Sequence, residues 1–273
     1  MSSRPARPDA PDSPPLDARM RRYMAARSAR RMASNVLSSM VRVVYRGRLD
    51  KREHAIIIPE SSWSPWRADA EFVDALSQVR AFTLVDEMRL YELWDLAGQL
   101  RSVPGDVLEV GVWRGGSGCL LALQCARGDV PATVFLCDTF SGVVQAGDED
   151  PIYEGGEHSD TSAELVDALA AHLGLDNVRV LVGTFPDDTA DAIADRRFKL
   201  CHLDVDVYAG SKASLEWAWP RLVPGGVVVV DDYGGDGMDG VRHAVDEFVG
   251  RVGCRMTYNL NGHAVLVKDG AGN

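Results

Sequence analysis

The sequence lacks any long run of apolar residues. Its valine block, Val227 to Val230, is far shorter than the roughly 18 residues that cross a bilayer. The N-terminal region has no apolar stretch typical of a signal peptide, and its aspartates (Asp9, Asp12 and Asp17) are atypical of a transit peptide. These absences argue against an integral membrane protein, so we expect a cytoplasmic protein without a membrane partner.

Cysteine is scarce and shows no motif. The chain has five cysteines, an odd number, and none of them forms a C-x-x-C pair. Disulfide frameworks and zinc ribbons use sets of cysteines at recognisable spacings, so neither is predicted. We expect buried, reduced thiols at Cys119, Cys125, Cys137, Cys201 and Cys254.

Basic residues are scarce outside the N-terminal part. Residues 1–52 contain 13 Lys and Arg against 4 Asp and Glu, whereas the remaining 221 residues contain 16 against 36. The body is therefore strongly acidic, within a formal net charge of −11. Such a body repels nucleic acid, and the basic segment carries no recognition motif, so no nucleic-acid partner is expected.

The 273 residues suffice for one large α/β domain with an attachment. Residues 1–17 are rich in proline and polar side chains, which predicts a disordered tail. Residues 18–102 show helical periodicity and predict an N-terminal arm that acts as a lid or as a contact in a homo-oligomer. Residues 103–273 are expected to form the catalytic domain.

From Val103 onward, apolar strands alternate with amphipathic helices, which predicts a doubly wound parallel sheet. Two further β-like runs flank Asn261-Gly262, a pair that favours a tight antiparallel hairpin. The expected fold is α/β, with a seven-stranded, mostly parallel, Rossmann-like sheet that resembles class I S-adenosylmethionine-dependent methyltransferases. The parallel strands are predicted at 106–111, 133–138, 177–183, 199–206 and 226–231, and the intervening helices near 116–128, 161–174, 187–196, 211–221 and 238–251.

A glycine-rich loop, EVGVWRGG, follows the first predicted strand. Trp113 stands where a dinucleotide fingerprint needs a glycine, and Ser117 stands where a P-loop has lysine, so NAD and ATP are disfavoured. An acidic loop suits the cationic amino-acid end of S-adenosylmethionine, and Asp138 at the next strand end can accept hydrogen bonds from ribose hydroxyls. Phe185 either lies against the adenine or packs in the core. We expect S-adenosylmethionine at Glu109, Gly111, Ser117, Asp138 and Phe185.

Carboxylates follow the fourth and fifth predicted strands. Asp204 and Asp206 come from one strand end, and Asp231 and Asp232 from the next. Neighbouring parallel strands lie about 5 Å apart, so these side chains converge and repel each other unless a cation joins them. An all-oxygen set favours a hard cation, which predicts Mg²⁺.

The chain from about Thr83 to its end resembles the metal-dependent macrocin-type O-methyltransferases, which act in macrolide and aminocoumarin biosynthesis. The resemblance implies that Mg²⁺ is bound by Asp204, Asp231 and Asp232, and that the acceptor is a sugar hydroxyl of a glycosylated natural product. The N-terminal arm and the loop 143–160 differ from the family pattern, and both are expected to face the acceptor. The motifs that carry the resemblance are VPGDVLEVGVWRGG (103–116), DTFSG (138–142), LDVDVY (203–208), PRLVPGG (220–226) and DDY (231–233).

A sugar hydroxyl is scarcely ionised at neutral pH, so the expected mechanism uses Mg²⁺ to lower its pKa and a carboxylate, Asp204 or Asp206, to accept its proton. No catalytic histidine is expected: His202 should point away from Asp204 or sideways, and His263 lies near no motif. Two alternatives remain open. The acceptor could be a catechol or another small diol, or the chain could be a cofactor-binding interaction protein that has lost catalysis.

Overall fold

The computed structural model describes residues 61–270, together with scattered helical positions between Arg22 and Met40 that agree with the helix expected there. The chain divides into two units, Met1–Ser62 and Trp63–Asn273, and the second unit contains the sheet. The tail predicted at 1–17 lies outside the described residues. Among the helices that are described, none has the length and apolar character needed to span a membrane.

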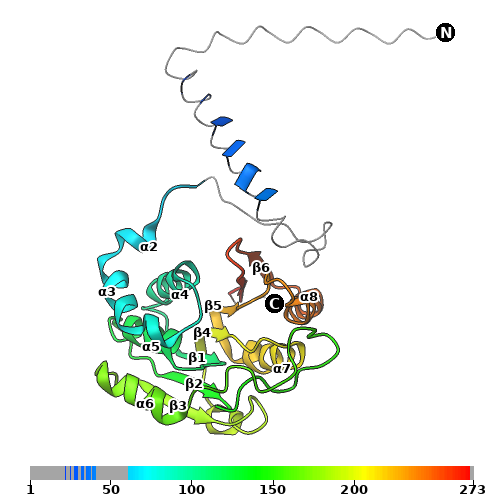
Figure 1. Cartoon of the computed structure of the whole chain (residues 1–273). Helices are drawn as coiled ribbons and strands as arrows, with labels where there is room; N and C mark the ends of the chain where they lie inside the picture. The colour runs from blue at the N-terminus through cyan, green and yellow to red at the C-terminus, as the bar shows by residue number, and fades with distance from the viewer. Residues whose placement is uncertain are drawn as a thin grey trace, which may run out of the picture. The chain divides into compact units, whose positions relative to one another are not determined.

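The predicted fold class is confirmed. Seven strands form one sheet in the order β3-β2-β1-β4-β5-β7-β6, in which the first five strands are parallel and the last two pair antiparallel (Figure 1). The order reverses between β1 and β4, the point at which open sheets of this kind bind ligands. The strands are β1 (Asp106–Val110), β2 (Val134–Asp138), β3 (Val178–Val182), β4 (Phe198–Leu203), β5 (Leu222–Val230), β6 (Arg255–Tyr258) and β7 (Ala264–Val267).

Helices cover both faces of the sheet, as the burial of parallel strands on both sides requires (Figure 1). Alternate residues of each strand face opposite layers, so Val107 packs in one core and Leu108 in the other. The first face is covered by α3 (Ala70–Val79), α4 (Glu87–Gln99), α5 (Gly116–Cys125) and α6 (Ala163–His172). The second is covered by α7 (Tyr208–Ala218) and α8 (Asp239–Val252), and the short α2 (Pro65–Ala68) precedes α3.

Helices α3 and α4 belong to the core of this unit, although the sequence pattern places residues 18–102 in an arm. Each helix begins after an aspartate whose side chain accepts hydrogen bonds from backbone N–H groups of the first turn, Asp69 for α3 and Asp86 for α4. Phe72 and Leu90 are fully buried in the same hydrophobic cluster as residues of β1 and α5. The sequence predicts a domain boundary between residues 102 and 103, but the hydrophobic core continues across this position.

Other elements differ from the prediction in their length or in the residue at which they end. The helix expected over 187–196 is only a short 3₁₀ turn, Ala190–Ile193. Strand β4 ends at Leu203, and Asp206 beyond it has a left-handed backbone with φ +64°. The predicted hairpin is present, because β6 and β7 pair across a turn in which Gly262 has φ +112°.

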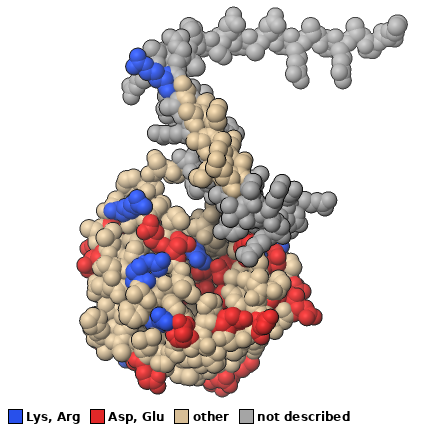
Figure 2. Space-filling model, viewed as in Figure 1, with Lys and Arg blue, Asp and Glu red and all other residues tan. Residues whose placement is uncertain are grey.

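The surface charge of the second unit is unevenly distributed. On the face shown in Figure 2, acidic side chains gather toward the side that carries α7 and α8, while basic side chains lie more toward α3 and α5. This distribution agrees with the excess of Asp and Glu after residue 52.

Candidate active site

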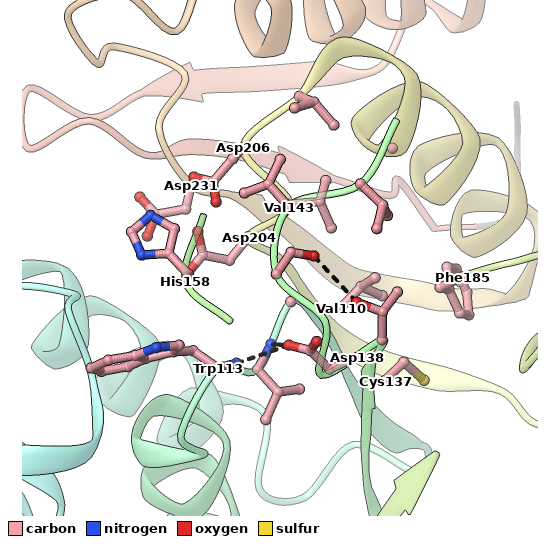
Figure 3. Close-up of a pocket in the computed structure, with 18 of the residues that line it drawn as sticks. Val110, Trp113, Cys137, Asp138, Val143, His158, Phe185, Asp204, Asp206 and Asp231 are labelled. Carbon is pink, nitrogen blue, oxygen red and sulfur yellow. Dashed lines mark hydrogen bonds between the residues drawn. The ribbon is translucent and has the colours of Figure 1, made fainter. Parts of the chain in front are cut away.

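A pocket lies at the carboxyl ends of the parallel strands. It is lined by the ends of β1, β2, β4 and β5, by residues 83–85 before α4, and by parts of the loop 142–158. Figure 3 shows acidic side chains on one side of this pocket and Asp138 with Trp113 on the other. The predicted site residues found in the lining are Gly111, Ser117, Asp138, Phe185, Asp204, Asp206, Asp231 and Asp232.

The loop after β1 requires glycine at position 111. Gly111 has φ +84°, and an added Cβ would lie 1.7 Å from a backbone carbonyl oxygen of the segment after β4. The N–H groups of Val112 and Trp113 donate to Asp138 Oδ2 at 2.7 and 2.9 Å, and the N–H of Phe140 donates to Asp138 Oδ1 at 2.7 Å. Asp138 Oδ2 thus orders the loop after β1, Oδ1 orders the turn after β2, and the carboxylate keeps lone pairs that can accept further hydrogen bonds.

Of the other three residues predicted to bind the cofactor, Ser117 and Phe185 line the pocket and Glu109 does not. Ser117 lies in the first turn of α5 and is buried. Phe185 borders the pocket, but its ring packs edge-on against Trp217 in the core with centroids 5.0 Å apart. Glu109 is absent from the lining, because strand alternation turns its side chain beneath α5, where its Oε1 lies 2.8 Å from His202 Nδ1. The structure therefore does not bring Glu109 to the cofactor side of the pocket.

Three carboxylates gather at the acidic side of the pocket. Ligand oxygens of Asp204, Asp206 and Asp232 lie within 4.8 Å of one another. Burial, reinforced by the charge of Asp231, raises the pKa of Asp204 and of Asp206, and raises the pKa of Asp232 to about 7. Asp206 and Asp232 also both have a left-handed backbone conformation. This conformation is uncommon for residues other than glycine and is concentrated at functional sites. An all-oxygen group that is costly to ionise has the chemistry of a hard-cation site.

Asp231 lies beside this group, and its side chain is only 1% exposed. Arg89 Nη1 contacts Asp231 Oδ1 and lies 3.2 Å from Asp232 Oδ1, while Arg89 Nε donates to Asp86 Oδ2 at 2.8 Å. Burial opposes ionisation, but the hydrogen bond to His263 and the charges of His263 and Arg89 hold the pKa of Asp231 well below its usual range. All three carboxylates predicted to bind Mg²⁺ line the pocket, but Asp231 already has cationic partners within the protein.

Sequence reasoning missed Arg89 because it lies 142 positions before Asp231, in a helix assigned to the arm. Its contact depends on how α4 packs against the sheet, which local sequence does not specify. One signal was available. Arg89 precedes the buried Leu93 by four residues, which places it on the inward face of the helix.

Among the described residues, the buried histidines His202 and His263 lie next to the acidic site. His263 Nδ1 is 2.6 Å from Glu92 Oε2, and its Nε2 is 3.5 Å from Asp231 Oδ1. His202 Nε2 is 4.0 Å from Asp231 Oδ2. Burial opposes protonation, but hydrogen bonds to Asp231 and Glu92 raise the pKa of His263 to about 9. The expectation that His263 lies near no motif is wrong, because the β5–β7 pairing carries it to the end of β5.

The loop 142–158 contributes Tyr153 and His158 to the pocket, and neither was predicted. The Tyr153 hydroxyl is hydrogen-bonded to Asp206, and its ring meets the His158 ring edge-on with centroids 6.4 Å apart. Asp150 ties the loop to α7, because its buried carboxylate accepts the N–H of Tyr208 at 2.9 Å. The loop therefore reaches one of the site carboxylates through Tyr153.

The model of the macrocin-O-methyltransferase family matches residues 39–259 of this chain. The 8-demethyl-8-(2,3-dimethoxy-alpha-L-rhamnosyl)-tetracenomycin-C 4'-O-methyltransferase of Streptomyces olivaceus is 37% identical over 161 residues, which cover 55% of this chain and 60% of that protein. The mycinamicin III 3''-O-methyltransferase of Micromonospora griseorubida is 36% identical over 188 residues, which cover 63% of this chain and 72% of that protein. The chain thus spans less than two thirds of the first relative.

The solved structure of the O-methyltransferase NovP has a similar fold. The two structures align with a TM-score of 0.59 and 25% sequence identity, over 69% of this chain and 83% of NovP. The resemblance drawn from the sequence motifs is confirmed by the family match.

Proposed function

Because this chain belongs to the macrocin-O-methyltransferase family, we propose that it transfers a methyl group from S-adenosylmethionine to a sugar hydroxyl of a glycosylated natural product. The observation that carries the proposal is that one pocket joins an ordered glycine loop to a cluster of carboxylates. Of the two relatives described above, one is named as an O-methyltransferase of a rhamnosyl-tetracenomycin and the other as an O-methyltransferase of mycinamicin III, which supports the acceptor class.

The cofactor is proposed to bind along the glycine loop. Gly111 permits close approach to the backbone, Ser117 lies at the start of α5, and Asp138 accepts hydrogen bonds from the ribose. Phe185, which borders the pocket, is proposed to lie on the adenine side. Glu109 is not proposed as a direct ligand, because it lies outside the lining and its Oε1 is 2.8 Å from His202 Nδ1.

Mg²⁺ is proposed to be held by Asp204, Asp231 and Asp232. Of these, Asp204 and Asp232 lie in one group of carboxylates with Asp206, whereas Asp231 lies beside that group and is grouped with His202 and His263. The donor set fits a hard cation, since every candidate atom is a carboxylate oxygen and burial makes their joint ionisation unfavourable without a cation. When bound, the ion lowers the pKa of an acceptor hydroxyl. Arg89 contributes a fixed positive charge beside it and orients Asp231 and Asp232.

The side chains of the protein then complete the reaction. Asp206, oriented by the Tyr153 hydroxyl, accepts the proton of the acceptor hydroxyl. The oxygen forms a bond to the methyl carbon as the carbon–sulfur bond breaks, and the bonding electrons stay on sulfur. The positive charge of the sulfonium and the negative charge of the oxygen are both neutralised, so a pocket that excludes water favours the step. The loop 142–158 is proposed to close over the acceptor.

The test is methyl transfer from labelled S-adenosylmethionine, followed by mass spectrometry, with rhamnosylated aromatic glycosides, macrolide glycosides and catechols as acceptors. Addition of one methyl group to a sugar is the expected result. Methylation of catechols alone would show that the acceptor is an aromatic diol and not a sugar. Cofactor binding without methylation of any acceptor would instead favour an interaction protein.

The metal requirement is tested with chelator. EDTA should abolish turnover and excess Mg²⁺ should restore it, while affinity for S-adenosylmethionine stays unchanged because the glycine loop and Asp138 lie on other strands. Full methylation after confirmed removal of metal would contradict the proposal. From the sequence pattern, we also propose that the protein forms a homo-oligomer and is located in the cytoplasm.

A further inference from the structure

The glycine loop after β1 contacts the chain beyond the loop 142–158 at Trp113. Trp113 borders the pocket, and its backbone is left-handed with φ +49°, a conformation that bulky residues rarely adopt. With this backbone, the successive N–H groups of Val112 and Trp113 converge on one oxygen of Asp138, at 2.7 and 2.9 Å (Figure 3). The conformation of Trp113 thus contributes directly to the hydrogen bonds that orient Asp138.

Two residues just beyond the loop 142–158 hold Trp113 from outside the pocket. The indole Nε1 of Trp113 donates to Asp160 Oδ1 at 2.8 Å, and the hydroxyl of Thr161 donates to the backbone carbonyl oxygen of Trp113. The hydrogen bond from the indole and the charge of Arg114 lower the pKa of Asp160, so this carboxylate is ionised at neutral pH. Asp160 and Thr161 are absent from the lining of the pocket.

Arg114 joins the same contact. Its Nε donates to the backbone carbonyl oxygen of Asp160 at 3.0 Å, and its Nη2 contacts Asp160 Oδ2. Its guanidinium group lies over the ring of Trp113, 4.5 Å from the centroid. The side chain of Asp160 is 63% exposed, so a substitution there removes these polar contacts without removing any part of the hydrophobic core.

Both ends of the loop 142–158 are connected to Asp138. Before the loop, the N–H of Phe140 donates to Asp138 Oδ1 at 2.7 Å. After the loop, Asp160 and Thr161 contact Trp113, whose N–H donates to Asp138 Oδ2. The orientation of Asp138 therefore depends on the segments that precede and follow this loop.

We propose that Asp160 and Thr161 are positioning residues for S-adenosylmethionine, which act through Trp113 and Asp138. The inference rests on the proposed function, in which Asp138 accepts hydrogen bonds from the ribose. It assigns part of the cofactor affinity to the end of the loop that is proposed to close over the acceptor. Because Asp160 acts through the indole of Trp113, the loss of either side of this hydrogen bond removes the effect of the other.

The first test is a double-mutant cycle in the full chain, with affinity for S-adenosylmethionine measured by calorimetry. Asp160→Ala removes the acceptor of the indole hydrogen bond, and Trp113→Phe removes its donor. Each single variant should bind about three- to tenfold more weakly than the wild type, the range expected for one hydrogen bond. The double variant should bind within about twofold of the weaker single variant, because the same contact is lost only once. Multiplied losses in the double variant would overturn the inference, since the two side chains would then act separately.

Thr161 provides a second measurement, which includes rescue by a conservative variant. Thr161→Val removes the hydroxyl and keeps the shape of the side chain, so it should weaken cofactor binding about three- to tenfold. Thr161→Ser keeps the hydroxyl and should bind within about twofold of the wild type. Equal affinity of the two variants would overturn the inference. Thr257→Val on β6 and Asp167→Ala on α6, both at exposed positions, are matched controls that should leave the affinity unchanged.

Failure of this inference is distinguishable from failure of the proposed function. Unchanged affinity in Asp160→Ala or in Thr161→Val, with normal binding by the wild type, would overturn the positioning role and leave the proposed cofactor in place. Failure of the wild-type chain to bind S-adenosylmethionine would reject the proposed cofactor and the positioning role with it.

Discussion

Asp138 connects the cofactor loop to the ligand that the loop is proposed to hold. Its carboxylate accepts three backbone N–H groups and still borders the pocket. Asp138→Ala should weaken S-adenosylmethionine binding by about 10- to 100-fold, because charge-assisted hydrogen bonds contribute roughly 1.5–3 kcal/mol. Calorimetry measures the affinity, and Asp167→Ala on the outer side of α6 is the control. Unchanged affinity in Asp138→Ala would remove this residue from the cofactor site.

Asp232 should make the stability of the metal-free protein depend on pH. Burial, followed by the charges of Asp231 and Asp206, raises the pKa of Asp232 in the folded state to about 7. An acid with a raised folded pKa stabilises the native state fully at low pH, and this contribution is lost as the pH rises through the folded pKa. In EDTA, the melting temperature should therefore fall as the pH rises from about 4, near the ordinary pKa of an aspartate, to about 7, and level off above that pH.

Asp232→Asn is the comparison for this pH effect, because the amide mimics the protonated carboxyl group and does not titrate. Its melting temperature should change less with pH than that of the wild type over the same range, and excess Mg²⁺ should flatten the wild-type curve in the same way. Identical pH curves for the two metal-free proteins would show that Asp232 does not titrate in this range.

Part of the site could be predicted from single residues and part could not. The aspartates after β4 and β5 were predictable, because a strand pattern in a parallel topology places its last residues at one edge. Arg89, Glu92 and His263 were not, because their contacts with the site depend on the packing of α4 and on the antiparallel placement of β7. Glu109 was assigned by its motif, but strand alternation turns its side chain away from the pocket.

At the scale of elements, the hydrophobic periodicity and the turn residues between apolar runs predicted most of the fold. The five parallel strands and the Asn-Gly hairpin follow from apolar runs and turn residues, and both are present. The role of α3 and α4 did not follow, because an amphipathic helix has the same pattern whether it covers a sheet or belongs to an arm. The helix predicted at 187–196 is mostly absent, since a local pattern does not ensure that the chain has room for a full helix.

The packing of α3 and α4 predicts a large effect of core substitutions in a segment that resembles an arm in sequence. Leu90 on α4 is fully buried, whereas Val73 on α3 is 45% exposed. Leu90→Ala should reduce the free energy of unfolding by about 2–5 kcal/mol through lost burial and cavity formation. Val73→Ala should change it by about 0.5 kcal/mol or less. Denaturant unfolding measures both, and a small effect of Leu90→Ala would show that α4 is not part of the folding core.

At the scale of the whole molecule, every residue that lines the pocket among those described lies in the second unit, Trp63–Asn273. The N-terminal part contributes a basic segment, 13 Lys and Arg in residues 1–52, to a protein whose remainder is acidic. The proposed cofactor and cation sites therefore draw on described residues of one unit.

A truncated protein that begins at residue 61 separates these roles. It retains α3 and α4, with the buried Phe72 and Leu90, so it should fold and melt cooperatively. Its affinity for S-adenosylmethionine should stay within about threefold of the full chain, because every described residue that lines the pocket is retained. If the N-terminal segment is a lid or subunit contact, kcat/KM for the glycosylated acceptor should fall while cofactor affinity does not. Acceptor kinetics, calorimetry and light scattering on the two proteins give the comparison. Equal acceptor kinetics and equal mass in solution would exclude both roles for residues 1–60 and leave the whole reaction to the unit that carries the sheet.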